Sequence, residues 1–598
     1  MSQRNPTITR TRWTQRLLQP ANILAGMMAA LFVYIMAIPV IMMIKDAVTV
    51  QPADGVKTGQ GPGELTSYYL WRTLRSPVSV DLFWRPLENT LSIALVVIFL
   101  TLIFGTFLAL LVQKSNVYGR KWFATALIIP YVLPSWTFAL AWQTIFTNRT
   151  TGGQSGWLEN AGLNPPDWLA YGRIPMIIIF TLHYGPLVFL LISNSLSRID
   201  SRNEEAALNA GADRLTVLWK ITLPLLRPAI LSASTLVLAK SIGEFGAAYV
   251  IGLPVNFSVL STSLYQSINT RQTGVAAVLA GALILIGAIG LFADYLFLRN
   301  ARKYVTITGK GNSSRVNPLG SWRIPATALV GLAFATSVLL PLGTLLLSTI
   351  MRYPGNFELS NFTLDYWIGH NLPTQAFRDG LLINSKLWSA LWNTVWIAAI
   401  AAAAAALMGM LTGYAVTRTT SSPLANLLKQ LAFIPYLVPG ISFAVAYLSL
   451  FAVQRGPIPP LYGTTFILIL ILAADEVPFA SRSGISSMMQ LGKESEEASL
   501  NAGASWGRTI AKIVLPIQKS ALAAAFVLPF ISATQALSPV IILATSETNL
   551  LTTLSMNLVD YGYTHAANGV TLMICLVALL GMVITRKVLK VDMGKGIS

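Results

Sequence analysis

The sequence predicts an all-α integral membrane protein of about twelve transmembrane helices, arranged as two parallel six-helix modules. Three observations predict this fold. Hydrophobic residues make up 54% of the 598-residue chain and charged residues only 11%, a balance typical of polytopic membrane proteins. The chain contains twelve apolar segments long enough to cross a bilayer. A polar stretch that follows the fourth segment returns almost unchanged after the tenth.

Each predicted span is an apolar segment of suitable length, because a bilayer core about 30 Å thick requires roughly 20 helical residues to cross it. The first apolar segment is longer than the core of a secretory signal, so we interpret it as a retained span. The twelve segments lie near residues 22–44, 89–113, 122–145, 174–195, 226–251, 274–298, 324–350, 391–416, 430–452, 463–480, 520–543 and 569–585.

The distribution of charge predicts which side of the membrane each loop occupies. The net charge is +18, which could indicate a nucleic-acid-binding protein. If both termini are cytoplasmic, however, the cytoplasmic side carries 29 Lys and Arg against 8 Asp and Glu, whereas the other side carries 12 against 12. This is the positive-inside asymmetry of membrane proteins. The charge therefore indicates a multi-pass topology with cytoplasmic N- and C-termini, and we expect lipid and no nucleic acid as partners.

The two halves of the chain are repeats of one module. Each half has six spans, so both modules have the same orientation and form a parallel repeat. We place the first module at residues 1–300, a basic cytoplasmic linker at 301–323 and the second module at 324–598. Matching markers occur in the same order in both halves: Asn89-Thr90 with Asn393-Thr394, the IPYVLP of 129–134 with the IPYLVP of 434–439, and the FALA of 138–141 with the FAVA of 443–446.

The duplicated polar stretch covers residues 204–224 and 496–516, with 12 of 21 positions identical. Its Glu-Glu-Ala opening favours a helix, because carboxylates in a first turn complement the helix dipole and Ala has high helix propensity. Gly211 and Gly503 then permit a sharp change of direction. We expect a short helix, a turn and a second helix that ends at Pro224, where the fifth span begins. Both copies fall on the predicted cytoplasmic side.

At these residues the chain resembles the permeases of type I ATP-binding cassette (ABC) importers. Their signature is Glu-Ala-Ala, three residues, Gly, nine residues, then Ile, any residue, Leu and Pro. The second copy differs from it only by a Ser in place of the second Ala. The matching residues are Glu205, Ala206, Ala207, Gly211, Leu223 and Pro224 in the first copy, and Glu497, Ala498, Ser499, Gly503, Leu515 and Pro516 in the second.

The resemblance implies a division of labour between this chain and its partners. Each stretch, at about 200–224 and 492–516, would be a coupling helix seated on one of two cytoplasmic ABC ATPase subunits. ATP and Mg²⁺ would be held by those subunits and no cofactor by this chain, which has no phosphate-binding P-loop and is not expected to be an enzyme. A periplasmic or surface solute-binding protein would deliver the cargo, and the chain would lie in a bacterial inner membrane.

Ionisable residues within spans are costly and mark candidate pathway positions. The candidates are His183, Lys240, Glu244, Asp475 and Glu476. Lys240 and Glu244 stand four residues apart, so one alternative is that they neutralise each other on one helix face. His183 precedes Gly185 and Pro186, which could break the helix, although a lone His is more often structural. The region around Thr534 to Ala536 in the second half has no acid, which predicts an asymmetric pathway.

The cargo is less sharply indicated than the family. The Glu244-Phe245-Gly246 sequence and the fused layout resemble permeases for ferric iron, 2-aminoethylphosphonate, thiamine or polyamines. No cluster of His, Cys or carboxylates has metal-ligand spacing, and the single Cys575 lies within the last span, so we expect no resident metal. The alternative function is a twelve-span secondary transporter of the major facilitator type, which needs no duplicated docking loop. A membrane enzyme would need catalytic residues that the sequence does not show.

Overall fold

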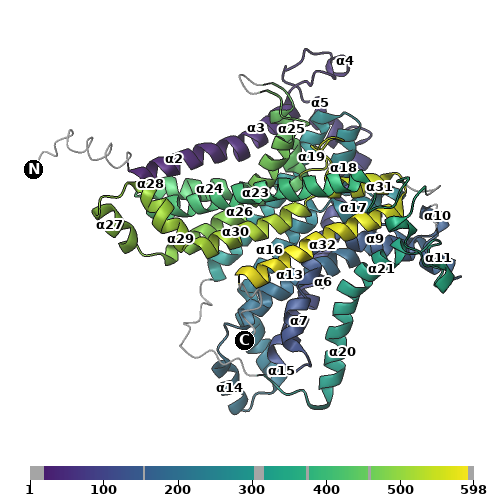
Figure 1. Cartoon of the computed structure of the whole chain (residues 1–598), viewed down its shortest axis with the longest axis horizontal. Helices are drawn as coiled ribbons and strands as arrows, with labels where there is room; N and C mark the ends of the chain where they lie inside the picture. Colours follow the sequence, from purple (N-terminus) through teal and green to yellow (C-terminus); the bar gives the residue numbers. More distant parts are fainter. Residues whose placement is uncertain (1–18, 153–154, 302–315, 372–375, 455–458, 590–598) are drawn as a thin grey trace, which may run out of the picture. The chain divides into compact units, whose positions relative to one another are not determined.

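The computed structural model describes residues 19–152, 155–301, 316–371, 376–454 and 459–589 (Figure 1). Within these ranges every regular element is a helix, and the few β-bridges are isolated. This confirms the predicted all-α class. Most of the expected linker at 301–323 lies outside the described residues.

The predicted spans are present as helices. One of them is missing from the set of described helices that are long and apolar enough to cross a membrane, and a helix pair from a predicted loop is in that set. Among the described residues, eight helices are long and apolar enough to cross a membrane, and four bent helix pairs raise the number to as many as twelve. One of the bent pairs, Gly246–Val255 with Leu260–Asn269, lies largely in a predicted loop. The predicted tenth span is a continuous helix at Thr465–Gln490, but it is not among the twelve, and its sequence includes Asp475, Glu476 and Arg482.

The structure divides into two compact units. Unit 1 comprises Met1–Leu65, Leu391–Leu550 and Leu580–Val591. Its helices are α2 (Pro20–Phe32), α3 (Ile38–Val48), α4 (Gly55–Thr58), most of α23 (Ser385–Arg418), α24 (Ser422–Leu437), α25 (Gly440–Phe451), α26 (Thr465–Gln490), α27 (Glu494–Asn501), α28 (Trp506–Thr509), α29 (Leu515–Ile517) and α30 (Lys519–Thr534).

Unit 2 comprises Thr66–Ala390, Leu551–Leu579 and Asp592–Ser598. Its helices are α5 (Tyr68–Leu74), α6 (Arg85–Lys114), α7 (Arg120–Ala126), α8 (Ile129–Val132), α9 (Ser135–Phe146), α10 (Arg149–Gly152), α11 (Trp157–Asn160), α12 (Asp167–Ala170), α13 (Arg173–Leu196), α14 (Ser201–Asn209), α15 (Arg214–Val217), α16 (Leu223–Gly243), α17 (Gly246–Gly252), α18 (Leu260–Asn269), α19 (Thr273–Ala301), α20 (Arg323–Phe334), α21 (Leu340–Thr349), α22 (Asp365–Ile368), α31 (Leu551–Asp560) and most of α32 (Thr564–Leu589).

The two compact units do not coincide with the two sequence modules. The first span of each module lies in the unit that holds most of the other module. In unit 1 the first span of the chain packs against the ninth, α2 on α24 and α3 on α25 (Figure 1). Tyr447 of α25 donates a hydrogen bond to the carbonyl oxygen of Ile35 at 2.9 Å. In unit 2 the seventh span packs against the third, α21 on α9. Each unit therefore contains the opening span of the other sequence module.

The internal repeat is visible in the packing of each unit. A Cβ built on Gly105 of α6 would lie 2.6 Å from the Cβ of Val188 in α13, and one built on Gly409 of α23 would lie 2.4 Å from the carbonyl carbon of Ala480 in α26. Gly105 and Gly409 are 304 residues apart, and Val188 and Ala480 are 292 residues apart. The helices α6 and α13 of unit 2 thus pack through a glycine in the same way as α23 and α26 of unit 1. The two offsets, 304 and 292 residues, show which residues of the two modules correspond.

Candidate functional site

The first half of each duplicated stretch is a short helix, as the sequence predicts. In unit 2 this helix is α14, and its N-cap residue Asp200 accepts a hydrogen bond from the backbone N–H of Arg202 at 3.0 Å. In unit 1 it is α27, which has three glutamates in its first turn. Carboxylates at this end complement the helix dipole. Both loops therefore start with a helix whose N-terminus is electrostatically favoured.

Each short helix ends at its motif glycine in the same hydrogen-bonded cap. Gly211 has a φ of +88°, in the region that favours glycine. Its N–H donates to the carbonyl of Leu208, and the N–H of Ala212 donates to the carbonyl of Ala207, both at 3.0 Å. This pair of bonds is the Schellman motif, which satisfies carbonyls at a helix end.

The second copy repeats this cap. Gly503 has a φ of +83°, its N–H donates to the carbonyl of Leu500 at 3.0 Å, and the N–H of Ala504 donates to the carbonyl of Ser499 at 3.1 Å. Among the described residues, no heavy atom lies within 4 Å of a Cβ built on either glycine. The glycines are therefore required by backbone conformation and not by a close neighbour, and the predicted change of direction is confirmed.

The second helix of the loop differs from the prediction in unit 2. Residues Arg214–Gly243 form one uninterrupted helical run, so the helix does not end at Pro224. A π-helical turn, Leu218–Thr222, directly precedes Leu223 and Pro224. A local π adjustment can accommodate the hydrogen bond that proline cannot make. In unit 1 the equivalent run bends by 74° between Trp506–Ile517 and Lys519–Thr534.

A largely buried ion pair fixes the first loop to the end of the second span. The Lys114 ammonium lies 2.9 Å from Oε2 and 3.0 Å from Oε1 of Glu204. The side chains are 11% and 14% exposed. The hydroxyl of Thr222 donates to the same carboxylate at 2.9 Å. Lys114 is the last residue of α6, so α14, α6 and the start of the fifth span meet at one carboxylate.

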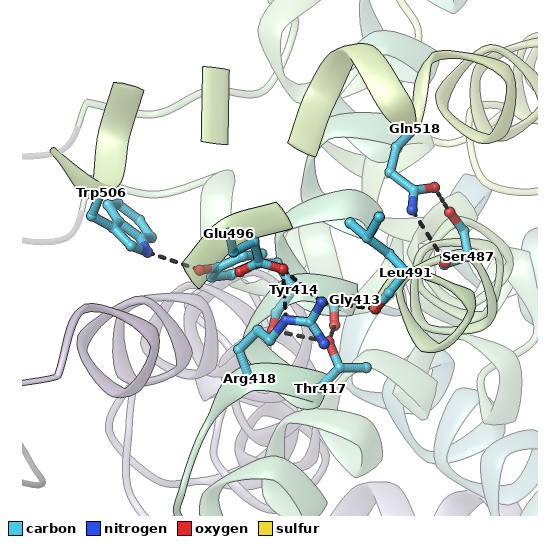
Figure 2. A network of polar contacts seen from close by, with 9 residues as sticks. All are labelled: Gly413, Tyr414, Thr417, Arg418, Ser487, Leu491, Glu496, Trp506 and Gln518. Atoms are coloured by element: carbon cyan, nitrogen blue, oxygen red, sulfur yellow. Dashed lines mark hydrogen bonds and ion pairs between the residues drawn. The ribbon is translucent and has the colours of Figure 1, made fainter. Parts of the chain in front are cut away.

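An equivalent ion pair fixes the second loop, as Figure 2 shows. Arg418 donates to Oε1 of Glu496 from Nε at 2.8 Å and from Nη2 at 2.6 Å, and Nη2 also donates to the carbonyl of Leu491 at 3.0 Å. Both side chains are at most 10% exposed. Arg418 is the last residue of α23. It lies 304 residues after Lys114, so the two cations occupy the same repeat position.

The second loop has additional internal ties. The indole N–H of Trp506 donates to the hydroxyl of Tyr414 at 3.0 Å (Figure 2). The hydroxyls of Ser499 and Thr509 lie 3.0 Å apart. Beneath the loop, Tyr414 belongs to a buried apolar cluster that contains Ala21 of the first span. Polar contacts therefore fix the loop against this buried apolar cluster.

Half of the predicted docking residues are exposed on these loops. Glu497, Ala498, Ala206, Gly211, Gly503 and Pro516 are exposed, whereas Glu205, Ala207, Ser499, Leu223, Pro224 and Leu515 are half-buried. Large apolar side chains are also exposed here: Leu215 by 63% and Trp219 by 65%. Sequence reasoning did not single out the four residues of the ion pairs. The matching position of Lys114 and Arg418 in the repeat was the signal that could have identified them.

The candidate pathway residue Glu244 is bound by hydroxyls at a break in the fifth span. It caps the end of α16 with an extended backbone. The hydroxyls of Ser135 and Tyr184 donate to its two carboxylate oxygens, each at 2.5 Å. Lys240 is an exposed residue of α16. Tyr184 also donates to the carbonyl oxygen of Lys240 at 3.3 Å. That Lys240 and Glu244 neutralise each other stays an alternative.

His183 is a buried residue of unit 2 beside this carboxylate site. Its Nδ1 lies 3.1 Å from the carbonyl oxygen of Pro130, and its ring packs on those of Tyr131 and Phe138. The break expected at Pro186 is absent, because α13 continues through it. Aromatic packing and the hydrogen bond give His183 a structural environment.

The repeat register relates the acids of the two modules. Asp475 and Glu476, both half-buried in α26, lie 292 residues after His183 and Tyr184. Where the first module has Glu244 at the break of its fifth span, the second has Ala536 at the same 292-residue offset, directly after Gln535 at the end of α30. The second module therefore has acids in its fourth span at the positions of the aromatic pair, and none at the fifth-span break.

Comparison with known proteins shows which permeases the chain is similar to. Residues 101–303 match the family described as "Binding-protein-dependent transport system inner membrane component". The chain is 29% identical to the putative ferric transport system permease protein FbpB 1 of Haemophilus influenzae over 78% of this chain and 71% of that protein. It is 28% identical to the ferric transport system permease protein FbpB of Actinobacillus pleuropneumoniae over 83% and 70% of the two chains.

A shorter relative matches part of the chain. The probable sulfate transport system permease protein cysT of Chlorokybus atmophyticus is 25% identical over 39% of this chain and 87% of its own length. These relatives are permease subunits, and the apolar helices of the chain are those of a multi-pass inner-membrane protein. Residues 101–303 therefore match the family of binding-protein-dependent transport system inner membrane components, and the similarity of the chain to ferric and sulfate transport permeases supports an ABC importer permease.

Proposed function

We propose that this chain forms the whole translocation pathway of an ABC importer and that each of its two coupling loops docks one cytoplasmic ATPase subunit. The observation that carries the proposal is the duplicated loop, in which the same Gly-capped helix is fixed to its unit by an equivalent ion pair. ATP and Mg²⁺ are bound by the two partner subunits. Their closure and reopening move the loops and alternate the access of the pathway.

The outer side of each loop has the chemistry of a docking surface. Small residues such as Ala206 and Ala498 are exposed and allow close approach of a partner. Glu497 is exposed beside them and offers a carboxylate to an Arg or Lys of the ATPase. Leu215 and Trp219 add apolar area that association would remove from water. A partner with a small apolar cleft and a basic rim fits this surface.

The charge asymmetry supports a cytoplasmic position for the loops and for both termini. A separate binding protein delivers the solute, because the predicted outer loops at 45–88 and 351–390 are too short to form a ligand-binding domain. We propose ferric iron as the cargo, which the similarity to two ferric transport permeases supports. Acidic positions within the spans, Glu244 above all, suit a cationic cargo.

The test reverses the docking charge in both loops with Glu205→Lys and Glu497→Lys. We expect the double variant to retain ATPase about tenfold less well or worse, since a reversed charge at a docking contact costs ~2 kcal/mol or more, and to lose uptake of radiolabelled ferric iron. A matched control is Glu64→Lys with Glu547→Lys, two exposed glutamates on the predicted outer side. Normal ATPase co-purification and uptake in the docking variant would refute the proposal.

A further inference from the structure

We propose that the ion pairs Lys114–Glu204 and Arg418–Glu496 are positioning contacts that pass the movement of each coupling loop to the exchanged first span of the opposite sequence module. The inference rests on the proposed function, because it assumes that an ATPase moves the loops. It assigns a role to residues outside the docking motif. The route within each unit has two steps, the ion pair and a set of hydrogen bonds just beyond it.

The first step joins the loop to the cytoplasmic end of the second or eighth span. In each unit the acid is the first residue of the Glu-Glu pair in the short helix, and the cation is the last residue of a long helix. The same contact occurs at the same repeat positions, although the cation is Lys in one module and Arg in the other. A contact that is present in both modules despite a change of residue type indicates a function of the charge pair itself.

The second step in unit 1 joins the end of the eighth span to the first span. Thr419 and Thr420 directly follow Arg418. The Asn22 side chain in α2 donates to the Thr420 hydroxyl at 3.1 Å and accepts from the Thr420 N–H at 3.2 Å. It also accepts a hydrogen bond from the Thr419 hydroxyl. Asn22 is 5% exposed, so its side chain is buried, and the bonds themselves are partly buried. The second loop thus connects to the first span of the chain.

The second step in unit 2 joins the end of the second span to the seventh. Arg323, the first residue of α20, donates from Nε to the carbonyl oxygen of Asn116 at 2.6 Å. Its guanidinium lies 3.6 Å from the ring centroid of Tyr118. The N–H of Tyr118 donates to the hydroxyl of Thr327 at 3.0 Å. Asn116 and Thr420 are 304 residues apart, so both routes use the same repeat position.

Burial explains why such a pair can transmit movement. Separating the charges would leave an ion without a partner in a poorly hydrated site, which costs far more than separating an exposed pair. The loop and the helix end therefore move together. Since each route ends on a span of the other sequence module, one ATPase moves helices of both modules. The exchanged spans thereby coordinate the two halves of the transport cycle.

The test measures transport per ATP hydrolysed in the full complex with its ATPase subunits and binding protein, using ferric iron as the probe. We expect Glu204→Gln and Glu496→Gln to keep the ATPase bound but to lower this ratio by about tenfold or more, because loss of one partner of a buried pair shifts an equilibrium by at least that factor. Glu494→Gln, an exposed glutamate of the same second loop, is the matched control and should retain the parental ratio.

Charge exchange separates a positioning role from a folding role. The double variants Lys114→Glu with Glu204→Lys, and Arg418→Glu with Glu496→Arg, should restore part of the ratio. Asn22→Ala and Arg323→Ala leave both ion pairs intact and should still lower the ratio with ATPase bound. Parental ratios in the Gln variants, or in these two Ala variants, would overturn the inference. Loss of ATPase binding only in the docking-face variants would leave the proposed function standing, so the two failures are distinguishable.

Discussion

The two motif glycines allow a quantitative prediction about the coupling loops. Gly211 and Gly503 have φ values of +88° and +83°, and open space surrounds a Cβ built on either. Substitution by Ala therefore adds no clash, and its whole cost is the strain of a left-handed backbone, about 1–2 kcal/mol for an L-residue. That cost corresponds to a roughly 5- to 30-fold increase in local opening of the cap.

Amide hydrogen exchange of the full chain in lipid discs measures this opening. The reporters are the amides of Ala212 and Ala504, whose bonds to the carbonyls of Ala207 and Ser499 close the caps. Exchange at these sites follows the local opening equilibrium. We expect Gly211→Ala and Gly503→Ala to speed exchange at their own reporter by the factor above.

Two further variants test the cause of this effect. Asn tolerates the left-handed region better than Ala, so Gly211→Asn and Gly503→Asn should speed exchange less than the Ala variants. Gly343→Ala is the matched control, because it also lies in open space but in the helix α21, where Ala is favoured. Exchange that is unchanged in the Ala variants, or faster with Asn than with Ala, would refute the reasoning from backbone strain.

Two other predictions follow from the spans. Gly409→Ala would place a Cβ 2.4 Å from the backbone of Ala480. Backbone cannot move away as a side chain could, so we expect a lower yield and a lower melting temperature of the purified chain. Gly281→Ala, which has open space around its Cβ, is the control, and equal melting temperatures of the two variants would contradict this packing. Glu244→Gln removes the charge that accepts hydrogen bonds from Ser135 and Tyr184. We expect ferric uptake to fall roughly 10- to 150-fold with ATPase retention intact, which corresponds to the 1.5–3 kcal/mol of one charge-assisted hydrogen bond. Tyr184→Phe retains the charge and should lower uptake less, and unchanged uptake in Glu244→Gln would exclude a role for the carboxylate.

The coupling loops were predictable from the sequence because their signals are local. A Glu-rich first turn and a glycine at the helix end act over a few residues, and α14, α27 and their Schellman caps formed where expected. The ion pairs were not predictable in this way, since Lys114 and Glu204 are 90 residues apart. The uninterrupted helix through Pro224 also escaped prediction, because proline usually marks a helix boundary and the compensating π turn has no simple sequence signal.

The exchange of first spans between the two modules was also not predictable from the sequence. Apolar periodicity indicates that a helix buries a face but not which helix covers it, so the contact of Tyr447 with Ile35 could not be inferred. Glu244 was selected from the sequence as an ionisable residue within a span. Its contacts with Ser135 and Tyr184 were not predicted, because these residues lie 109 and 60 positions earlier in the sequence.

The central claim is that one chain docks two ATPase subunits, one on each coupling loop. The native mass of the complex purified through this chain in detergent tests it most directly, combined with a single-loop variant, Glu497→Lys. We predict a mass of one chain with two ATPase subunits for the parent, and of one chain with one ATPase subunit for the variant. A parent complex with fewer than two ATPase subunits, or a variant that retains both, would contradict the account.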